Sequence, residues 1–151
     1  MKPFQIIVSA VFILIFSLNV QASDVFVQKK SPYSVKQTLD RVEAILHKKG
    51  ISVFARVDHA AGAEKVGLQM NDTQLLIFGN PKMGTPLMNE QILMGLDLPM
   101  KMLAWKDASG QTWLAYTSPQ ALQQRHGLKN QFIIEKMTKA LDGISQKALQ
   151  N

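Results

Sequence analysis

A polar segment with two glycines, between residues 77 and 88, is the first place where this sequence could do chemistry. The stretch IFGNPKMGTPLM is typical of a strand end, a loop and the start of a helix. Free amides at a helix start, together with Lys82, could attract a carboxylate or phosphate group. A phosphate-binding loop needs Gly-Lys followed by Ser or Thr, whereas Lys82 precedes Gly84 by two positions. We therefore expect either a structural turn or a weaker anion site formed by Asn80, Lys82 and Thr85.

A second candidate is the adjacent pair Asp58 and His59 at the end of an expected strand. A neighbouring carboxylate can hold one tautomer of an imidazole and tune its pKa for acid–base work or ligation. Adjacent strand residues point to opposite faces, so the alternative is a histidine that bonds only to the backbone. His126 could complete a polar pocket with His59. His47 falls on the last turn of an expected helix, where its role is structural.

Methionine is dense in the middle of the chain, with five residues between Met83 and Met102. Thioether sulfurs can hold copper(I), which prefers soft ligands, but they also fill irregular gaps in cores. Only Met100 and Met102 have a tight spacing, so packing is the preferred interpretation and a copper carrier the alternative. The sequence has no Ser-His-Asp order, no local pair of catalytic carboxylates and no His-x-x-x-His spacing. It therefore leaves the catalytic residues unknown and predicts no metal site and no cofactor.

The N-terminus has the layout of a secretory signal peptide. Lys2 precedes an apolar run from Ile6 to Val20, and small residues follow up to Ala22. The run is shorter than a membrane span normally requires, which favours cleavage after Ala22 over a retained anchor. We therefore expect a signal peptide over residues 1–22, one domain over residues 23–151, and a mature protein in the periplasm or outside the cell.

Composition narrows the classes further. The net charge is +6, and removal of Lys2 with the signal lowers it by one, to +5. Basic residues are scattered without an aromatic stripe, so nucleic acid is not an expected partner. The chain has no cysteine, which excludes disulfides, thiol catalysis and cysteine-bound metal. An exported domain of this kind must be stabilised by its core.

The elements that would position these residues follow from hydrophobic periodicity. Residues 24–30 alternate as a first strand, and Ser34 can cap a helix that ends near Gly50. Residues 51–58 alternate strictly, with Ile51, Val53, Ala55 and Val57 on one face, and a polar break follows at residues 59–65. The continuous apolar run from residue 75 to 78 predicts a strand covered on both faces, by a helix layer or by a second subunit.

The C-terminal half continues the same pattern. A short helix is expected over residues 85–95, and two strands joined by the turn at residues 107–110 predict an antiparallel hairpin. A short helix over residues 118–128 and a longer one over residues 130–149 complete the chain. The prediction is a single compact α+β domain, with a mainly antiparallel sheet of about five strands packed with about four helices.

Several of these segments together resemble the bacterial domain of unknown function 302 family. The combination of Asp58-His59, Phe78-Gly79-Asn80-Pro81 and Leu98-Pro99 carries the resemblance, which extends from Ser31 to Leu128. It implies a compact sandwich-like domain that is commonly dimeric and has no established activity. The positions that the resemblance marks as characteristic here are Asp58, His59, Asn80, Pro81, Lys82, Gly84, Thr85, Asp97, Pro99, Trp105, Tyr116 and His126.

The sequence thus predicts an exported, non-enzymatic binding protein that forms a homodimer. Its ligand would be a small anionic or polar molecule in a polar pocket. The candidate ligand-binding residues are Asp58, His59, Asn80, Lys82, Thr85 and His126. The alternatives are a hydrolase- or isomerase-like enzyme with His59 as general base, and a periplasmic copper binder.

Overall fold

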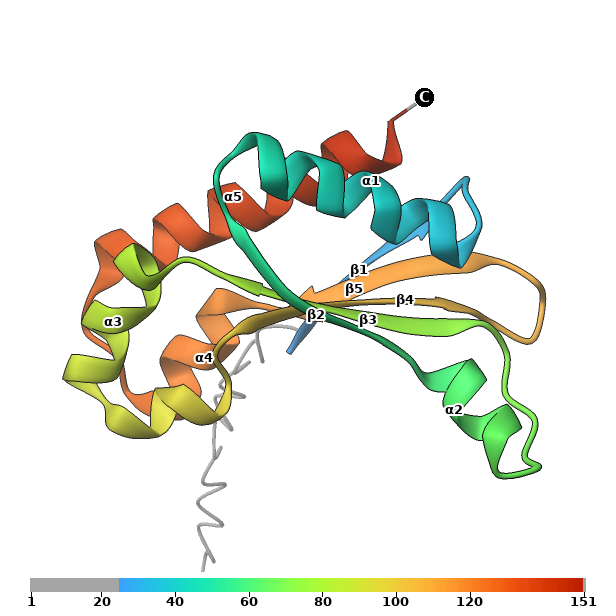
Figure 1. Ribbon diagram of the computed structural model, residues 1–151. Coiled ribbons are helices and arrows are strands. Elements are labelled where there is room, and N and C mark those ends of the chain that lie inside the picture. The colour runs from blue at the N-terminus through green and yellow to red at the C-terminus, as the bar shows by residue number, and fades with distance from the viewer. Residues whose placement is uncertain (1–24, 151) are drawn as a thin grey trace, which may run out of the picture.

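A computed structural model describes residues 25–150, so the predicted signal peptide over residues 1–22 lies outside the described residues. Figure 1 shows a curved sheet with two long helices along one side. The elements in chain order are β1 (Phe26–Ser31), α1 (Val35–Lys48), β2 (Ser52–Asp58), α2 (His59–Lys65), β3 (Thr73–Gly79), α3 (Pro81–Glu90), the 3₁₀ helix η1 (Ile92–Leu96), β4 (Met100–Lys106), β5 (Thr112–Thr117), α4 (Pro119–His126) and α5 (Gln131–Leu149).

The five strands form one antiparallel sheet in the order β1-β5-β4-β3-β2. Strands β2 and β3, β3 and β4, and β4 and β5 pair as sequence neighbours, but only β4 and β5 are joined by a short turn, since helices lie in the other two connections. The predicted single α+β domain with a mainly antiparallel sheet is confirmed. The number of α-helices in the described chain is five rather than about four, because a segment expected to be a polar break is helical.

Helix α1 forms where its sequence signals predict it. Ser34 accepts a hydrogen bond from the Gln37 amide and the Gln37 side chain reciprocates, which makes a capping box. The helix ends at Lys48, and Gly50 follows with a φ of +66°, a conformation that glycine adopts without steric cost. Its buried residues include Leu39, Val42 and Leu46, each with no exposed surface.

The core lies between the sheet and the layer formed by α1 and α5 (Figure 1). Buried residues alternate along the three inner strands, as with Leu76 and Phe78 on β3 or Met102 and Ala104 on β4. The longer helix expected near the C-terminus forms as α5, and its apolar positions Ile133, Met137, Leu141 and Ile144 are all buried.

The other face of the sheet, which neither α1 nor α5 covers, is only half-buried. We call it the open face and define it by Leu75, Ile77, Leu103, Trp105 and Trp113. The rings of Trp105 and Trp113 stack with centroids 6.3 Å apart and planes at 16°. The continuous apolar strand predicted over residues 75–78 is therefore confirmed, while helices of this chain cover one of its two faces.

Strand β2 departs from the predicted strict alternation. Its pairing with β3 shifts register between Val53 and Ala55, so that Val53 lies opposite buried Phe78 while Val57 lies opposite Leu75. The expectation that Val53, Ala55 and Val57 share one face is wrong, because the bulge adds one residue and reverses the alternation. The reversal turns Arg56 toward α1.

Two connections also differ from expectation. Residues 59–65 form α2 rather than a break, because the Asp58 side chain accepts a hydrogen bond from the Ala61 amide and caps a short helix. Helix α3 begins at Pro81 rather than Thr85, because Asn80 is its N-cap and proline is favoured in the first turn. The expected loop is thus mostly helical.

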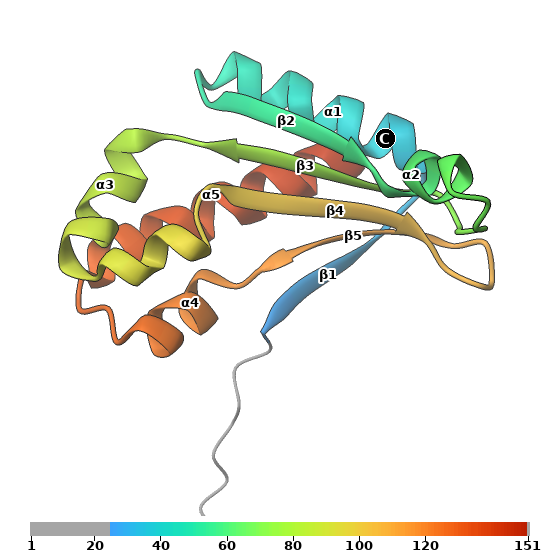
Figure 2. The same cartoon turned by 60° about the horizontal axis from the view of Figure 1, so that its bottom comes forward.

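Figures 1 and 2 place α2 at one end of the sheet, and α3 and α4 at the other. The register explains this, because Asp58 pairs with Gln74 at one end of the β2–β3 hairpin and Ser52 pairs with Gly79 at the other. We call the first the polar end and the second the pocket end. Among the described helices, none combines the length and the hydropathy that a membrane span requires.

Candidate functional site

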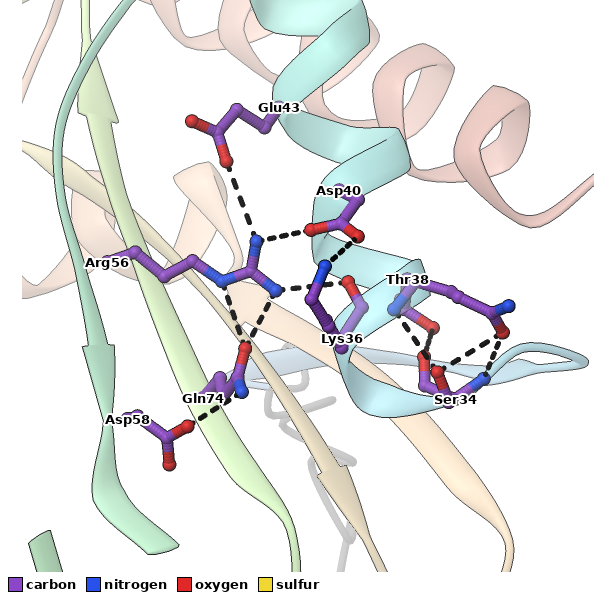
Figure 3. A network of polar contacts seen from close by, with 9 residues as sticks. Ser34, Lys36, Thr38, Asp40, Glu43, Arg56, Asp58 and Gln74 are labelled. Carbon is purple, nitrogen blue, oxygen red and sulfur yellow. Dashed lines mark hydrogen bonds and ion pairs between the residues drawn. The ribbon is translucent and has the colours of Figure 1, made fainter. Parts of the chain in front are cut away.

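At the polar end, Asp58 is held in a structural network. One carboxylate oxygen accepts a hydrogen bond from the Ala61 amide at 2.9 Å, and the other accepts one from Gln74 Nε2 at 2.8 Å. Gln74 Oε1 in turn accepts hydrogen bonds from Arg56 (Figure 3). Asp58 therefore caps α2 and orients Gln74, and both of its oxygens already have partners.

Arg56 is the centre of the same network (Figure 3). Its guanidinium lies 2.6 Å from Asp40 and 3.6 Å from Glu43, and it donates a 3.0 Å hydrogen bond to the Lys36 carbonyl. Hydrogen bonds from Lys36 and Arg56 hold the pKa of the Asp40 carboxyl below its usual range, although partial burial opposes them. The cluster ties the first turns of α1 to β2 and β3.

His59 does not join this network. It is the first residue of α2, its side chain is exposed, and its ring makes no contact with an acid among the described residues. The adjacent Asp58 carboxylate is directed to Ala61 and Gln74 instead. The pairing that would have prepared His59 as a general base is thus not formed.

At the pocket end, the amides expected to attract an anion are already used. Asn80 Oδ1 accepts a hydrogen bond from the Lys82 amide at 2.9 Å, and the Asn80 carbonyl accepts from Met83 and Gly84 at 2.9 and 3.1 Å. Pro81 has no amide hydrogen to offer. The amides in the first turn of α3 are therefore already hydrogen-bonded to Asn80. They cannot form an anion site together with the exposed Lys82 side chain.

A cavity of about 270 Å³ lies beside this turn, between the ends of β3 and β4, helix α3 and helix α5. We call it the apolar pocket. Asn80 and Thr85 supply its polar side chains, and the Thr85 hydroxyl makes no hydrogen bond to a described residue. The other lining residues are Ile51, Phe54, Phe78, Gly79, Pro81, Met83, Gly84, Met88, Leu98, Pro99, Met100, Met137, Ala140, Leu141 and Ile144.

Both glycines of the GNPKMG segment serve the walls of this pocket. A Cβ atom on Gly79 would lie 3.2 Å from Cε2 of Phe54, and one on Gly84 would lie 3.3 Å from Cδ1 of Leu98. Neither glycine has a positive φ. Their small size therefore allows close packing of neighbouring side chains, and not a backbone cradle for phosphate.

His126 lies at the pocket end but does not line the pocket. Its Nε2 is 2.6 Å from Asp97, and Arg125 lies 2.9 Å from the other oxygen of the same carboxylate. Burial works against ionisation of Asp97, but the hydrogen bonds from His126 and Arg125 outweigh it and lower the pKa of this carboxyl. The cluster joins the end of α4 to the segment that leads into β4.

The six residues predicted to bind a ligand thus fall into three places. Asp58 and His59 lie at the polar end, Asn80 and Thr85 line the apolar pocket, and His126 pairs with Asp97. Lys82 lies on the exposed first turn of α3. Asp58 and His59 therefore do not share a pocket with Lys82 and His126, because the length of β2 and β3 separates them.

The apolar lining of the pocket was not predicted from the sequence, although the dense run of methionines was a signal for it. Of the five central methionines, Met94 and Met102 are fully buried, whereas Met83, Met88 and Met100 line the pocket together with Met137. The dense methionine run was interpreted as core filling. No group of three histidine or acidic residues that could hold a metal ion is present among residues 25–150.

Comparison with known protein families shows to which family this chain belongs. The model of the family described as "Domain of unknown function DUF302" matches residues 27–144, most of the chain. The chain belongs to the DUF302 family. The crystal structure of an uncharacterized conserved DUF302 protein from Bacillus stearothermophilus superposes with a TM-score of 0.75 at 20% identity, covering 83% of this chain and 99% of that one. The fold of this DUF302 domain is therefore one that a solved protein also has.

Longer relatives contain a similar segment. The chain is 44% identical over 121 residues to proteins named fluoride-specific ion channel FluC 1, from Brucella suis, and FluC 2, from Brucella melitensis. The match covers 79% of this chain but 48% and 45% of those proteins. The DUF302 chain thus spans about half the length of these relatives.

Proposed function

We propose that this DUF302 protein is a non-enzymatic binding domain whose ligand is a small amphipathic molecule held in the apolar pocket. The observation that carries the proposal is the pocket itself, a cavity of about 270 Å³ with mainly aliphatic, aromatic and thioether walls. Small-molecule sites are typically concave and mostly apolar, with a few polar groups that fix orientation. Asn80 and Thr85 are the polar groups in this position.

The pocket favours an apolar body with one polar end over a fully charged ligand. A charged group buried among methionine, leucine and phenylalanine side chains would lose its hydration without a compensating partner. The free Thr85 hydroxyl can donate to or accept from a hydroxyl or carboxyl group at the rim. Methionine side chains adapt to irregular shapes, so the walls suit a flexible chain.

The test is a thermal-shift and calorimetric titration with octanol, octanoate and inorganic phosphate. We expect octanol and octanoate to raise the melting temperature and phosphate to have no effect. Ala140→Trp places a large side chain at an exposed lining position and should abolish the response. Ala44→Trp, at an exposed position of α1 outside the pocket, is the matched control and should retain it.

Two further variants separate this proposal from the anionic ligand that the sequence predicted. Thr85→Val keeps the shape of the side chain but removes the hydroxyl, so it should weaken the binding of octanol. Lys82→Ala should leave binding unchanged, because Lys82 does not line the pocket. Stabilisation by phosphate that is lost in Lys82→Ala would instead support the anion site and refute the apolar one.

We also propose that the mature protein is a homodimer that buries the open face against the same face of a second copy. Packed sheets lie about 10 Å apart with interdigitated side chains, and a two-fold axis needs a self-complementary patch. Leu103 and Trp105 lie on β4, the central strand, and are suited to that axis. Light scattering should give the dimer mass for the wild type and the monomer mass for Leu103→Lys, whereas a monomeric wild type would contradict the proposal.

Export remains a proposal that rests on the N-terminal sequence. The expected mature chain begins at Ser23, directly after Ala22. Mass measurement of the protein recovered from a periplasmic extract should give the mass of residues 23–151. An intact chain that remains with the membrane fraction would point to a retained anchor instead.

A further inference from the structure

The 3₁₀ helix η1 carries three large apolar side chains that the fold does not bury. Ile92 is 75% exposed, Leu93 58% and Leu96 79%, while Met94 alone of this segment is fully buried. We call the three exposed residues the η1 tip. Scattered exposed apolar residues are normal, but three within five positions form a local concentration that packing does not explain.

The tip is well supported by its own hydrogen bonds. The amides of Met94 and Asp97 donate to the carbonyls of Gln91 and Met94, and the Leu98 amide also donates to Met94. The Gln91 side chain accepts from the Leu93 amide. The apolar side chains therefore project from a segment with a satisfied backbone, and not from an unpaired edge that waits for another strand.

Basic residues flank both ends of the tip, and the acids beside them are engaged. Arg125 pairs with Asp97, next to Leu96, and keeps about half of its side chain exposed. Glu90, two residues before Ile92, accepts hydrogen bonds from the amides of Lys129 and Asn130, which brings the exposed Lys129 alongside.

The opposite end of the molecule provides a contrast. Val66, Leu68 and Met70 are also exposed there, at 71%, 65% and 53%. Leu68 and Met70, however, line a hollow together with the carboxylates of Asp58, Glu64 and Asp72. Three carboxylates and no basic side chain of residues 25–150 line that hollow, although Lys106 pairs with Asp72 beside it, so it would attract an anionic surface less than the basic flanks of the η1 tip.

We propose that the η1 tip docks on an anionic lipid surface. Ile92, Leu93 and Leu96 would insert at the boundary of headgroups and acyl chains, and Arg125 and Lys129 would face the lipid phosphates. Exposed apolar side chains with adjacent cations are the combination that interfacial binding uses. The net positive charge of the chain favours the same approach.

Co-sedimentation with vesicles tests this proposal. The vesicles contain either phosphatidylcholine alone or equal parts of phosphatidylcholine and phosphatidylglycerol. We expect binding to the mixed vesicles that weakens with salt, and little binding to phosphatidylcholine alone. The double variant Ile92→Ser with Leu96→Ser should reduce binding at least tenfold, and Lys129→Gln should reduce it several-fold.

The matched control is the double variant Val66→Ser with Leu68→Ser, which removes similarly exposed side chains at the polar end. It should bind as the wild type does. Absence of wild-type binding to the mixed vesicles, or equal losses in both double variants, would overturn the proposal. So would loss of the dimer mass in the η1 variant together with unchanged vesicle binding, because the tip would then contact protein.

Discussion

At the polar end of the sheet, Arg56, Asp58 and Gln74 form hydrogen bonds with one another, and Arg56 also bonds to α1. At the pocket end, the walls are apolar and the Thr85 hydroxyl has no hydrogen-bond partner among the described residues. The residues with the most reactive side chains therefore hold the fold together. The residues that sequence reasoning treated as packing surround the cavity. Both carboxylate oxygens of Asp58 are already hydrogen-bonded within the fold, which leaves this side chain little capacity for a ligand.

The largest expected effect comes from the anchor of the pocket end. Leu87 is the single buried residue of α3, with no exposed surface. Leu87→Ala should lower the free energy of unfolding by about 2–5 kcal/mol, because it removes buried methyl groups and leaves a cavity. Urea titration followed by circular dichroism measures this. Leu93→Ala, at a site 58% exposed, is the control and should change stability by less than about 0.5 kcal/mol.

The next largest effect should come from the polar end. Arg56→Met keeps the aliphatic stem but removes the donors to Asp40, Gln74 and the Lys36 carbonyl. Hydrogen bonds to charged groups contribute about 1.5–3 kcal/mol, so stability should fall within that range.

Lys36→Met is the matched control for Arg56→Met, since it also removes a cation from Asp40. Its side chain is 75% exposed, and exposed ion pairs contribute about 0–1 kcal/mol. Equal losses in the two variants would mean that the half-buried position of Arg56 confers no advantage. Unchanged octanol binding in Arg56→Met would show that the two ends work independently.

A smaller effect is expected at the cap of α3. Asn80→Ala removes the acceptor of the Lys82 amide and should cost about 1 kcal/mol of stability. It also frees that amide, so the variant is the form of the protein best able to bind phosphate at α3. Phosphate titration of Asn80→Ala by calorimetry distinguishes a cap that blocks an anion site from a turn that never offered one.

The smallest effect concerns pH. The pKa of Asp97 is lowered in the folded state, so its contribution to stability is complete above its unfolded value of about 3.8 and is lost as pH falls through the folded value. The melting temperature of Asp97→Asn should therefore lie below that of the wild type near neutral pH and approach it below pH 4. Asp72→Asn, at an exposed pair with Lys106, should show no such convergence.

Much of the fold could be predicted from periodicity and capping signals. Helix α1 begins after Ser34 and ends before Gly50, as expected, and the hairpin of β4 and β5 forms around the predicted turn. The errors arose where one side chain changes the local geometry. Asp58 caps α2, so a segment without buried residues forms a helix. Asn80 caps α3, which begins at Pro81, four residues before the expected start at Thr85.

The site was harder to predict because it depends on which residues meet. The sequence gives no distance between Asp58 and Lys82, and the antiparallel register separates them. The pocket walls come from β3, β4, α3 and α5, which meet only through the tertiary fold. Methionine density was a usable signal, but core and cavity walls use the same residue type.

The bulge in β2 also bears on how the sheet meets other proteins. Strands β2 and β1 are the two edges, and each leaves backbone groups that another chain could pair with. The register shift between Val53 and Ala55 interrupts the regular spacing of those groups along β2, and β1 carries Lys29 and Lys30. Both devices oppose the edge-to-edge growth that leads to fibrils. The dimer proposed through the open face would therefore close at two copies, because neither edge strand favours pairing with a further chain.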